Sequence, residues 1–203
     1  MKYVTALPEL EALFGPVGEA SVRKEVPVIH PAYRAWIEAS PFLVLATSGE
    51  TGLDVSPRGD PAPLVRVKDA ATLLLPERRG NNRIDSLRNI IANPNVAMIF
   101  FVPGVRETVR VNGTAKICTE PSVLAEFAMQ GVLPKCVIEV SVQAVFFQCA
   151  RALLRSSLWS GEQVAGRRTV PTAGEMLAAL TQGAVGGKAY DDELPQRQAK
   201  TLY

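Results

Sequence analysis

The chain is poor in the residues that carry metal sites and side-chain catalysis. It has one histidine and three cysteines among 203 residues. Cys118, Cys136 and Cys149 are odd in number and form no Cys-x-x-Cys motif, which disfavours a structural zinc site and a disulfide framework. Any Ser-His-Asp or Cys-His arrangement would have to use His30, which directly precedes Pro31. We therefore expect no metal, and we expect a cofactor to supply the chemistry if the protein is an enzyme.

Long apolar segments and a strong charge imbalance are also missing. The longest uninterrupted apolar run, Val96–Val102, is far shorter than the roughly 20 residues that a membrane-spanning helix needs. The amino-terminal residues include no apolar stretch typical of a secretory signal, so the expected location is the cytoplasm. The 22 lysines and arginines nearly balance the 20 aspartates and glutamates, and the net charge of +2 disfavours a protein that coats a polyanion. Any anion site must therefore be local.

No familiar phosphate-binding loop is present either. The sequence has no Gly-x-Gly-x-x-Gly, and Gly187-Lys188 lacks both the upstream glycine and the following serine or threonine of a P-loop. The basic segments contain no interleaved aromatic residues on which nucleic-acid bases could stack. We expect the partners to be a small-molecule substrate or electron donor, and neither nucleic acid nor a membrane.

What the chain does contain is a series of short β-type segments. With 47% hydrophobic and 21% charged residues, it has the composition of a globular protein, and its length suits one main domain. Runs rich in Val, Leu, Ile, Phe and Thr alternate with turn residues. The predicted strands cover residues 42–47, 53–56, 64–67, 71–75, 96–102, 109–117 and 138–146. Few helices separate them, which disfavours repeated βαβ units and favours a mainly antiparallel barrel with helical additions.

Helical patterns occur before, within and after the strands. We interpret residues 1–40 as a helical cover, 41–150 as the barrel domain and 151–203 as a helical arm that packs on the barrel or on a partner subunit. The arm includes glycine-rich stretches at 161–168 and 183–187. The predicted helices cover residues 8–14, 31–39, 82–91, 121–129, 151–158 and 172–180.

One arginine stands in a setting that suits an anion. The segment Ser56-Pro57-Arg58-Gly59-Asp60-Pro61 places a guanidinium in what we predict to be a rigid turn after a strand. A guanidinium held in this way can bind two oxygens of a phosphate. The alternative for this segment is an ordinary β-turn with an exposed arginine.

A second basic segment strengthens the first interpretation. Arg78-Arg79-Gly80-Asn81-Asn82-Arg83 precedes a predicted helix that Asn81 or Asn82 would cap, and Ser86 adds a hydroxyl to its first turn. The free N–H groups of a helix start favour anions, and the helix dipole disfavours arginines there. A bound anion would resolve this conflict.

Five segments carry, in this order, a resemblance to a known family. They are Pro41–Thr47, Ser56–Asp60, Asn82–Ile90, Asn93–Val96 and Glu107–Gly113. Together they resemble the pyridoxamine 5′-phosphate oxidase-like family over about residues 30 to 160. The resemblance implies a split, Greek-key antiparallel β-barrel that forms a homodimer and binds FMN at the dimer interface. Arg58, Arg83 and Ser86 fit the implied phosphate-binding role, and Ser56 and Asn82 are further cofactor-binding candidates beside them.

The segment Cys149–Trp159 resembles the carboxy-terminal part of one subgroup, in which aromatic and basic residues approach the flavin from the other subunit. Arg155 and Trp159 are therefore cofactor-binding candidates, with packing in a core or interface as the equally weighted alternative for Trp159. Pro63 and Lys68 stand where authentic oxidases have an Arg and Lys pair, and Arg197-Gln198-Ala199 lacks their histidine. The expectation is an FMN-dependent oxidoreductase of unknown substrate that does not make pyridoxal phosphate. The alternative is a protein that binds FMN or another phosphate ligand without turnover.

Overall fold

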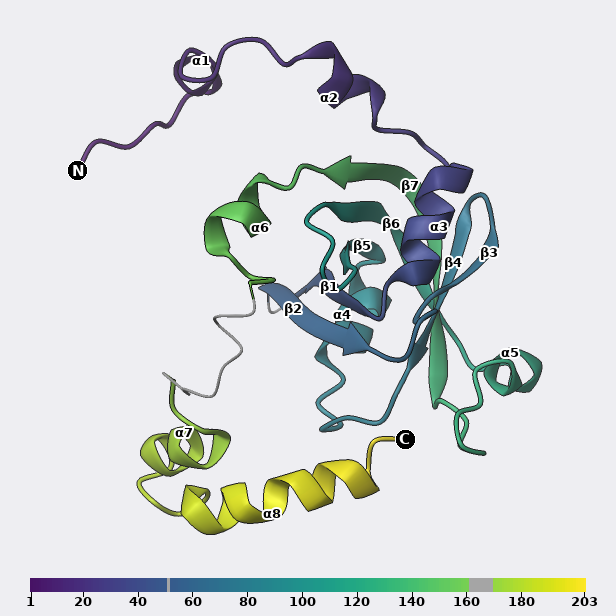
Figure 1. The fold of residues 1–203 in the computed structure, drawn as a ribbon, viewed down its shortest axis with the longest axis vertical. Helices are drawn as coiled ribbons and strands as arrows, with labels where there is room; N and C mark the ends of the chain where they lie inside the picture. Colours follow the sequence, from purple (N-terminus) through teal and green to yellow (C-terminus); the bar gives the residue numbers. More distant parts are fainter. Residues whose placement is uncertain (51, 161–169) are drawn as a thin grey trace.

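A computed structural model describes residues 1–50, 52–160 and 170–203, and its centre is a seven-stranded antiparallel sheet (Figure 1). The order of the strands is β2-β1-β5-β6-β7-β4-β3. Their bounds are β1 (Phe42–Gly49), β2 (Gly52–Gly59), β3 (Arg66–Asp69), β4 (Thr72–Glu77), β5 (Asn95–Phe101), β6 (Thr108–Cys118) and β7 (Cys136–Gln148). Because β4 lies beside β7, at the far side of the β5-β6-β7 meander, these four strands have the Greek-key order. The prediction of a mainly β, antiparallel fold is confirmed, whereas the homodimer stays a prediction.

The sheet curls until β2 approaches β4. Four strands separate these two in the sheet order. Even so, Nε of Arg58 on β2 lies 3.0 Å from Oε2 of Glu77 on β4. Within the described residues no backbone ladder joins β2 to β4, so the sheet forms a barrel that stays open along this side. The Arg58–Glu77 ion pair bridges the opening through side chains.

β2 is longer than the sequence predicted, and this corrects the placement of Arg58. The pairing of β2 with β1 continues through Arg58, opposite Leu43, to Gly59, opposite Phe42. Arg58 therefore belongs to a strand and not to the turn that we predicted. Pro57 has no N–H to donate. It is tolerated because β2 is an edge strand that pairs only with β1, so the missing N–H costs no hydrogen bond to a second neighbouring strand. The predicted turn at residues 48–52 includes Thr51, which lies outside the described residues.

The helices agree with the sequence patterns less closely. The helix at Pro31–Ala39 (α3) matches its prediction, and Nδ1 of His30 accepts a hydrogen bond from the Ala32 N–H at 3.2 Å, so the one imidazole caps this helix. The other helices are α1 (Leu7–Glu11), α2 (Glu19–Arg23), α4 (Asp85–Ala92), α5 (Pro121–Ala125), α6 (Arg151–Ser156), α7 (Ala173–Leu180) and α8 (Gly187–Lys200). The patterns did not predict α2 or α8. The predicted glycine-rich stretch 161–168 lies outside the described residues.

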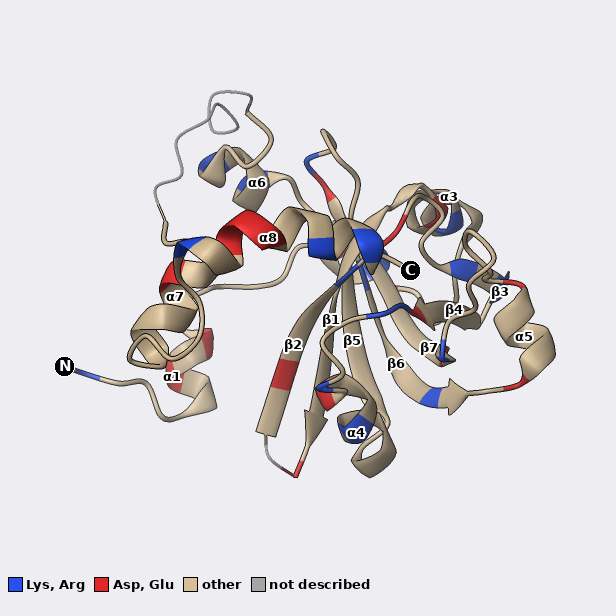
Figure 2. Ribbon diagram, turned by 90° about the horizontal axis from the view of Figure 1, so that it is seen from below, with Lys and Arg blue, Asp and Glu red and all other residues tan. Residues whose placement is uncertain are grey.

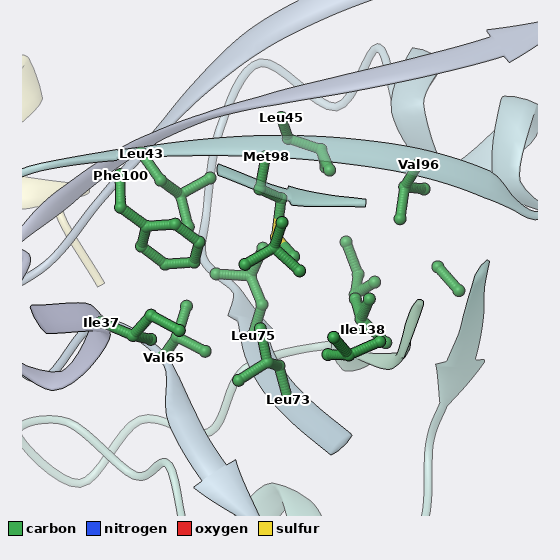
Figure 3. Close-up of a cluster of buried hydrophobic side chains, with 14 of the residues drawn as sticks. Ile37, Leu43, Leu45, Val65, Leu73, Leu75, Val96, Met98, Phe100 and Ile138 are labelled. Carbon is green, nitrogen blue, oxygen red and sulfur yellow. The ribbon is translucent and has the colours of Figure 1, made fainter. Parts of the chain in front are cut away.

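The core fills the inside of the curled sheet. Fully buried side chains from β1, β4, β5 and β7 meet there, and Ile37 of α3 covers one end of the cluster (Figure 3). The labelled members include Leu43, Leu45, Leu73, Leu75, Met98, Phe100 and Ile138. Their inward direction follows from the alternation of side chains along each strand. The same alternation sends Asp54, Ser56 and Arg58 to one side of β2.

The segments at the two ends of the chain lie around this barrel. Helices α1 and α2 bury none of their residues, and Figure 1 shows them apart from the sheet. Val26 pairs with Val145 of β7 through a single bridge, which ties the segment before α3 to the barrel. Within the described residues, no helix combines the length and the apolar character needed to cross a bilayer.

Candidate functional site

A cleft of about 680 Å³ lies at the open side of the barrel, between β2 and the end of β4. The segment between β4 and α4, together with the first turn of α4, completes its wall. This volume falls within the range of small-molecule binding sites, roughly 300–1,000 Å³. The cleft therefore has the size of a cofactor site at the one side of the barrel where backbone pairing stops.

The structure brings together five of the predicted cofactor-binding residues. The residues of this group that line the cleft are Ser56, Arg58, Asn82, Arg83 and Ser86. Arg155 and Trp159 do not line it. Arg155 is exposed on α6, and the indole Nε1 of Trp159 donates a hydrogen bond to the Val105 carbonyl oxygen at 2.8 Å. Within one chain, Trp159 therefore makes a packing contact and Arg155 makes no cleft contact.

A chain of hydrogen bonds orients the polar side chains of the cleft. The Arg58 guanidinium donates from Nε to Glu77 at 3.0 Å and from Nη1 to Ser56 Oγ at 2.9 Å. The hydroxyls of Ser56 and Ser86 lie 2.9 Å apart, and Ser86 donates to Oδ2 of Asp54 at 2.7 Å. This network orients one guanidinium and two hydroxyls at the cleft wall.

The start of α4 has an unusual backbone. Asn82 and Ile84 adopt positive φ angles of 60° and 54°, and a β-branched residue such as Ile84 is strained in this conformation. The N-cap position belongs to Ile84, with no side-chain cap, so our assignment of the cap to Asn81 or Asn82 is wrong. Asn81 instead accepts a hydrogen bond from the Arg83 N–H at 3.1 Å. The first turn of α4 thus faces the cleft without a capping acceptor, a role that an anion can take.

The charges that line the cleft leave an excess of two positive charges. The cations are Arg58, Arg78, Arg79, Arg83 and Lys135. The carboxylates are Asp54, Glu77 and Asp85. Asp60, which lies outside the lining, pairs with Arg78, so counting it leaves five cations against four carboxylates around the cleft, a net charge of +1 that favours an anion. Figure 2 shows acidic and basic positions interspersed over the ribbon as a whole.

Sequence reasoning missed several residues of the cleft. Glu77 and Cys136 meet because β4 pairs with β7, and this long-range pairing leaves no local signal in the sequence. Lys135 reaches the cleft for the same reason, since it directly precedes β7. Asp54 was detectable, because it stands two positions before Ser56 and strand alternation places both on one side. No cluster of three or more metal-binding side chains occurs among the described residues.

Residues 29–149 match the family model described as pyridoxamine 5′-phosphate oxidase. The chain belongs to this family. The matched span contains the whole barrel and every residue that lines the cleft, whereas α6, α7 and α8 follow it. The family resemblance inferred from the ordered segments is therefore confirmed.

Solved structures with detectable similarity match about three fifths of this chain at low sequence identity. The HupZ protein of Group A Streptococcus is 23% identical, with a TM-score of 0.48, and the match covers 59% of this chain and 93% of that one. An FMN-binding protein from Syntrophomonas wolfei is 9% identical, with a TM-score of 0.45 and coverages of 57% and 83%. An FAD-binding protein from Mycobacterium smegmatis is 17% identical, with a TM-score of 0.43 and coverages of 61% and 97%. No curated protein matches the chain.

The thiol of Cys136 lines the cleft, and we expect it to be unreactive. Burial, with a smaller contribution from the Glu77 carboxylate, raises its pKa to about 11. At pH 8 only about one such thiol in a thousand is ionised, so alkylation should be slow. Cys149 is exposed and should react with iodoacetamide first, which peptide mass spectrometry can follow. Equal labelling of Cys136 and Cys149 would contradict the burial of the cleft thiol.

The raised pKa of Cys136 also has a consequence for stability. The thiol of an unfolded chain ionises near pH 9, before the folded one. The free energy of unfolding should therefore fall as the pH rises from 9 towards 11, and Cys136→Ala should reduce this loss.

Proposed function

We propose that the protein is a flavin-dependent oxidoreductase that binds FMN with its phosphate in the cleft between β2 and β4. One observation carries the proposal: Arg58, Ser56, Ser86 and the uncapped start of α4 converge on one cleft. An oriented guanidinium and the free N–H groups of a helix start both suit a phosphate monoester. Membership of the family supports the choice of a flavin over other phosphate ligands.

The residues of the cleft are suited to binding and orientation. A bound flavin would supply the hydride or electron transfer. Arg58, Ser56 and Ser86 would hold the phosphate, while Leu64 and Pro76 provide apolar wall for the rest of the ligand. The Cys136 thiol stays protonated at neutral pH because its pKa is raised to about 11. The chain's contribution to the reaction is therefore to position the reactants.

One observation favours a second candidate function. The single imidazole, His30, caps α3 and does not line the cleft, so a histidine acid or base is missing there. A protein that binds FMN or another phosphate ligand without turnover would have the same features. Such a protein would serve storage, sensing or regulation of a partner.

Spectroscopy separates these possibilities. The purified protein should show visible flavin absorption, or gain it when FMN is added, because the proposed site would hold the phosphate of FMN. Bound flavin should then be reduced by NADH, NADPH or a small amine and reoxidised by oxygen or a quinone at catalytic rates. Tight FMN binding with slow reduction by every donor would contradict the proposed enzyme and favour a protein that binds FMN without turnover. A folded protein that stays colourless with added FMN would contradict both.

We also propose that two copies assemble into a homodimer with two equivalent sites. The outward face of β1 and β2 carries exposed apolar side chains, with Leu53 87%, Val55 65% and Phe42 41% exposed. A second copy would bury this face. The mass in solution should therefore be twice the 21.9 kDa of one chain. A monomer at all micromolar concentrations, with FMN still bound, would contradict this prediction.

A further inference from the structure

A second pocket, of about 290 Å³, adjoins the cleft. The two spaces share a wall made of Arg78, Arg79, Asn82 and Lys135. A molecule in this pocket would therefore lie next to a ligand in the cleft. Its volume lies near the lower end of the range for small-molecule sites. We call this space the side pocket.

One side of the side pocket is apolar. Val132, Leu133 and Pro134, which precede β7, line it together with the ring of Tyr203. Val132 and Leu133 keep about half of their surfaces exposed, so they do not serve the core. Exposed apolar side chains that face a pocket are typical of a binding surface for an apolar molecule.

Arg78 is a fixed part of this wall and not a free cation. Its Nε lies 2.7 Å from Oδ2 of Asp60, whose side chain is 4% exposed, and its Nη1 donates to the Phe127 carbonyl oxygen at 2.7 Å. The Tyr203 hydroxyl donates to the other oxygen of Asp60 at 3.0 Å, and the Tyr203 ring lies 5.7 Å from the guanidinium. The hydrogen bond to Asp60 also raises the pKa of Tyr203. Asp60 therefore neutralises Arg78 and anchors the tyrosine beside it.

In the part of the chain that the structure describes, the other two cations of the side pocket pair with no aspartate or glutamate. The Arg79 guanidinium makes no ion pair or hydrogen bond with any described residue. Nζ of Lys135 contacts Oδ1 of Asn82 at 3.5 Å and forms no ion pair within the described part of the chain. No aspartate or glutamate is among the residues that line the side pocket. Two uncompensated positive charges thus face an apolar surface across a small space.

We propose that the side pocket binds a small aromatic carboxylate next to the ligand of the cleft. Arg79 and Lys135 hold the carboxylate, and Val132, Leu133 and the Tyr203 ring contact the aromatic body. A planar carboxylate matches the fork of an arginine, and the apolar wall distinguishes such a molecule from a simple inorganic anion. Its position beside a bound flavin rests on the proposed flavin function, whereas binding of the carboxylate does not.

Calorimetric titration of the full chain with benzoate tests the proposal, both without flavin and after loading with FMN. We expect benzoate to bind at least about 10-fold more tightly than benzamide, which lacks the charge, and than acetate, which lacks the ring. Arg79→Gln and Lys135→Gln should each weaken benzoate binding by about 5-fold or more. Lys188→Gln, which changes an exposed lysine paired with Asp192, is the matched control. Leu133→Asn should also weaken benzoate binding, while FMN affinity stays the same.

Two results would contradict the proposal that the side pocket binds an aromatic carboxylate. One is equal binding of benzoate, benzamide and acetate in both forms of the protein. The other is competition between benzoate and FMN, which would assign Arg79 and Lys135 to the phosphate. Selective benzoate binding by a protein that takes up no FMN would support the proposed carboxylate site and contradict the proposed flavin function. The two proposals can therefore fail separately.

Discussion

Replacing Arg58 by alanine is expected to weaken FMN binding by about 10- to 150-fold, which corresponds to roughly 1.5–3 kcal/mol for a charged hydrogen bond. The guanidinium is 16% exposed and is oriented by both Glu77 and Ser56. Its loss removes the best-placed cationic donor and leaves the Glu77 carboxylate unpaired beside the phosphate. Quenching of FMN fluorescence during titration measures the change, and circular dichroism reports whether the fold is intact.

The neighbouring arginine gives a graded comparison. Arg83→Ala should fall at the lower end of the same range, because its side chain is 74% exposed and pairs with Asp85. Lys188→Ala is the control, since this lysine is exposed on α8 and pairs with Asp192. Equal small effects of all three substitutions would mean that Arg58 and Arg83 are solvated surface side chains and not a phosphate site.

Gly113→Ala should lower the free energy of unfolding by about 3 kcal/mol, at the top of the usual range for an overpacked interior. Gly113 lies at the irregularity in the β6–β7 ladder, where it pairs with Val142. A Cβ atom added here would stand 2.2 Å from the Ser141 carbonyl oxygen and 3.1 Å from its carbon. The obstacle is backbone, so a change of side-chain rotamer cannot relieve it. Urea unfolding measures the loss.

Gly80→Ala is the matched control for this substitution. An added Cβ at Gly80 meets no described atom within 4 Å, so its stability should stay within about 0.5 kcal/mol of the natural protein. If Gly113→Ala were as stable as Gly80→Ala, the β6–β7 pairing at Ser141 would have to shift without cost. That result would contradict the tight register of the two strands.

Local patterns were sufficient to predict most of the sheet and α3. Strand alternation marks residues 109–117 and 138–146, and the structure pairs them as β6 and β7. Pro31 at the first helical turn and apolar residues on one face mark α3 with its observed ends. These signals succeed because they depend only on neighbours in the sequence. The helix α8 was missed because it begins at Gly187 directly after Gly186, contains Pro195 and buries none of its residues.

The site was harder to predict than the sheet. The arginine-bearing segments pointed to an anion site, but Arg58 lies in β2 because pairing with β1 overrides the turn preference of its proline and glycine neighbours. Ile84 at the start of α4 also adopts a conformation that β-branched residues avoid, so the local capping rule failed there. The carboxylate Glu77, which orients Arg58, comes from a strand that becomes adjacent only after the sheet curls.

The open side of the barrel links ligand binding to the stability of the whole fold. Between β2 and β4, where a closed barrel would have backbone hydrogen bonds, the ion pairs of Arg58 with Glu77 and of Arg78 with Asp60 span the gap. A phosphate bound by Arg58 of β2 and by the start of α4, beyond β4, would cross-link the same two edges. Ligand at 100 times its dissociation constant adds about 2.7 kcal/mol to a folded state. In this barrel the added stability would come from contacts across the gap between β2 and β4. A bound cofactor would there take the place of the backbone hydrogen bonds of a closed barrel.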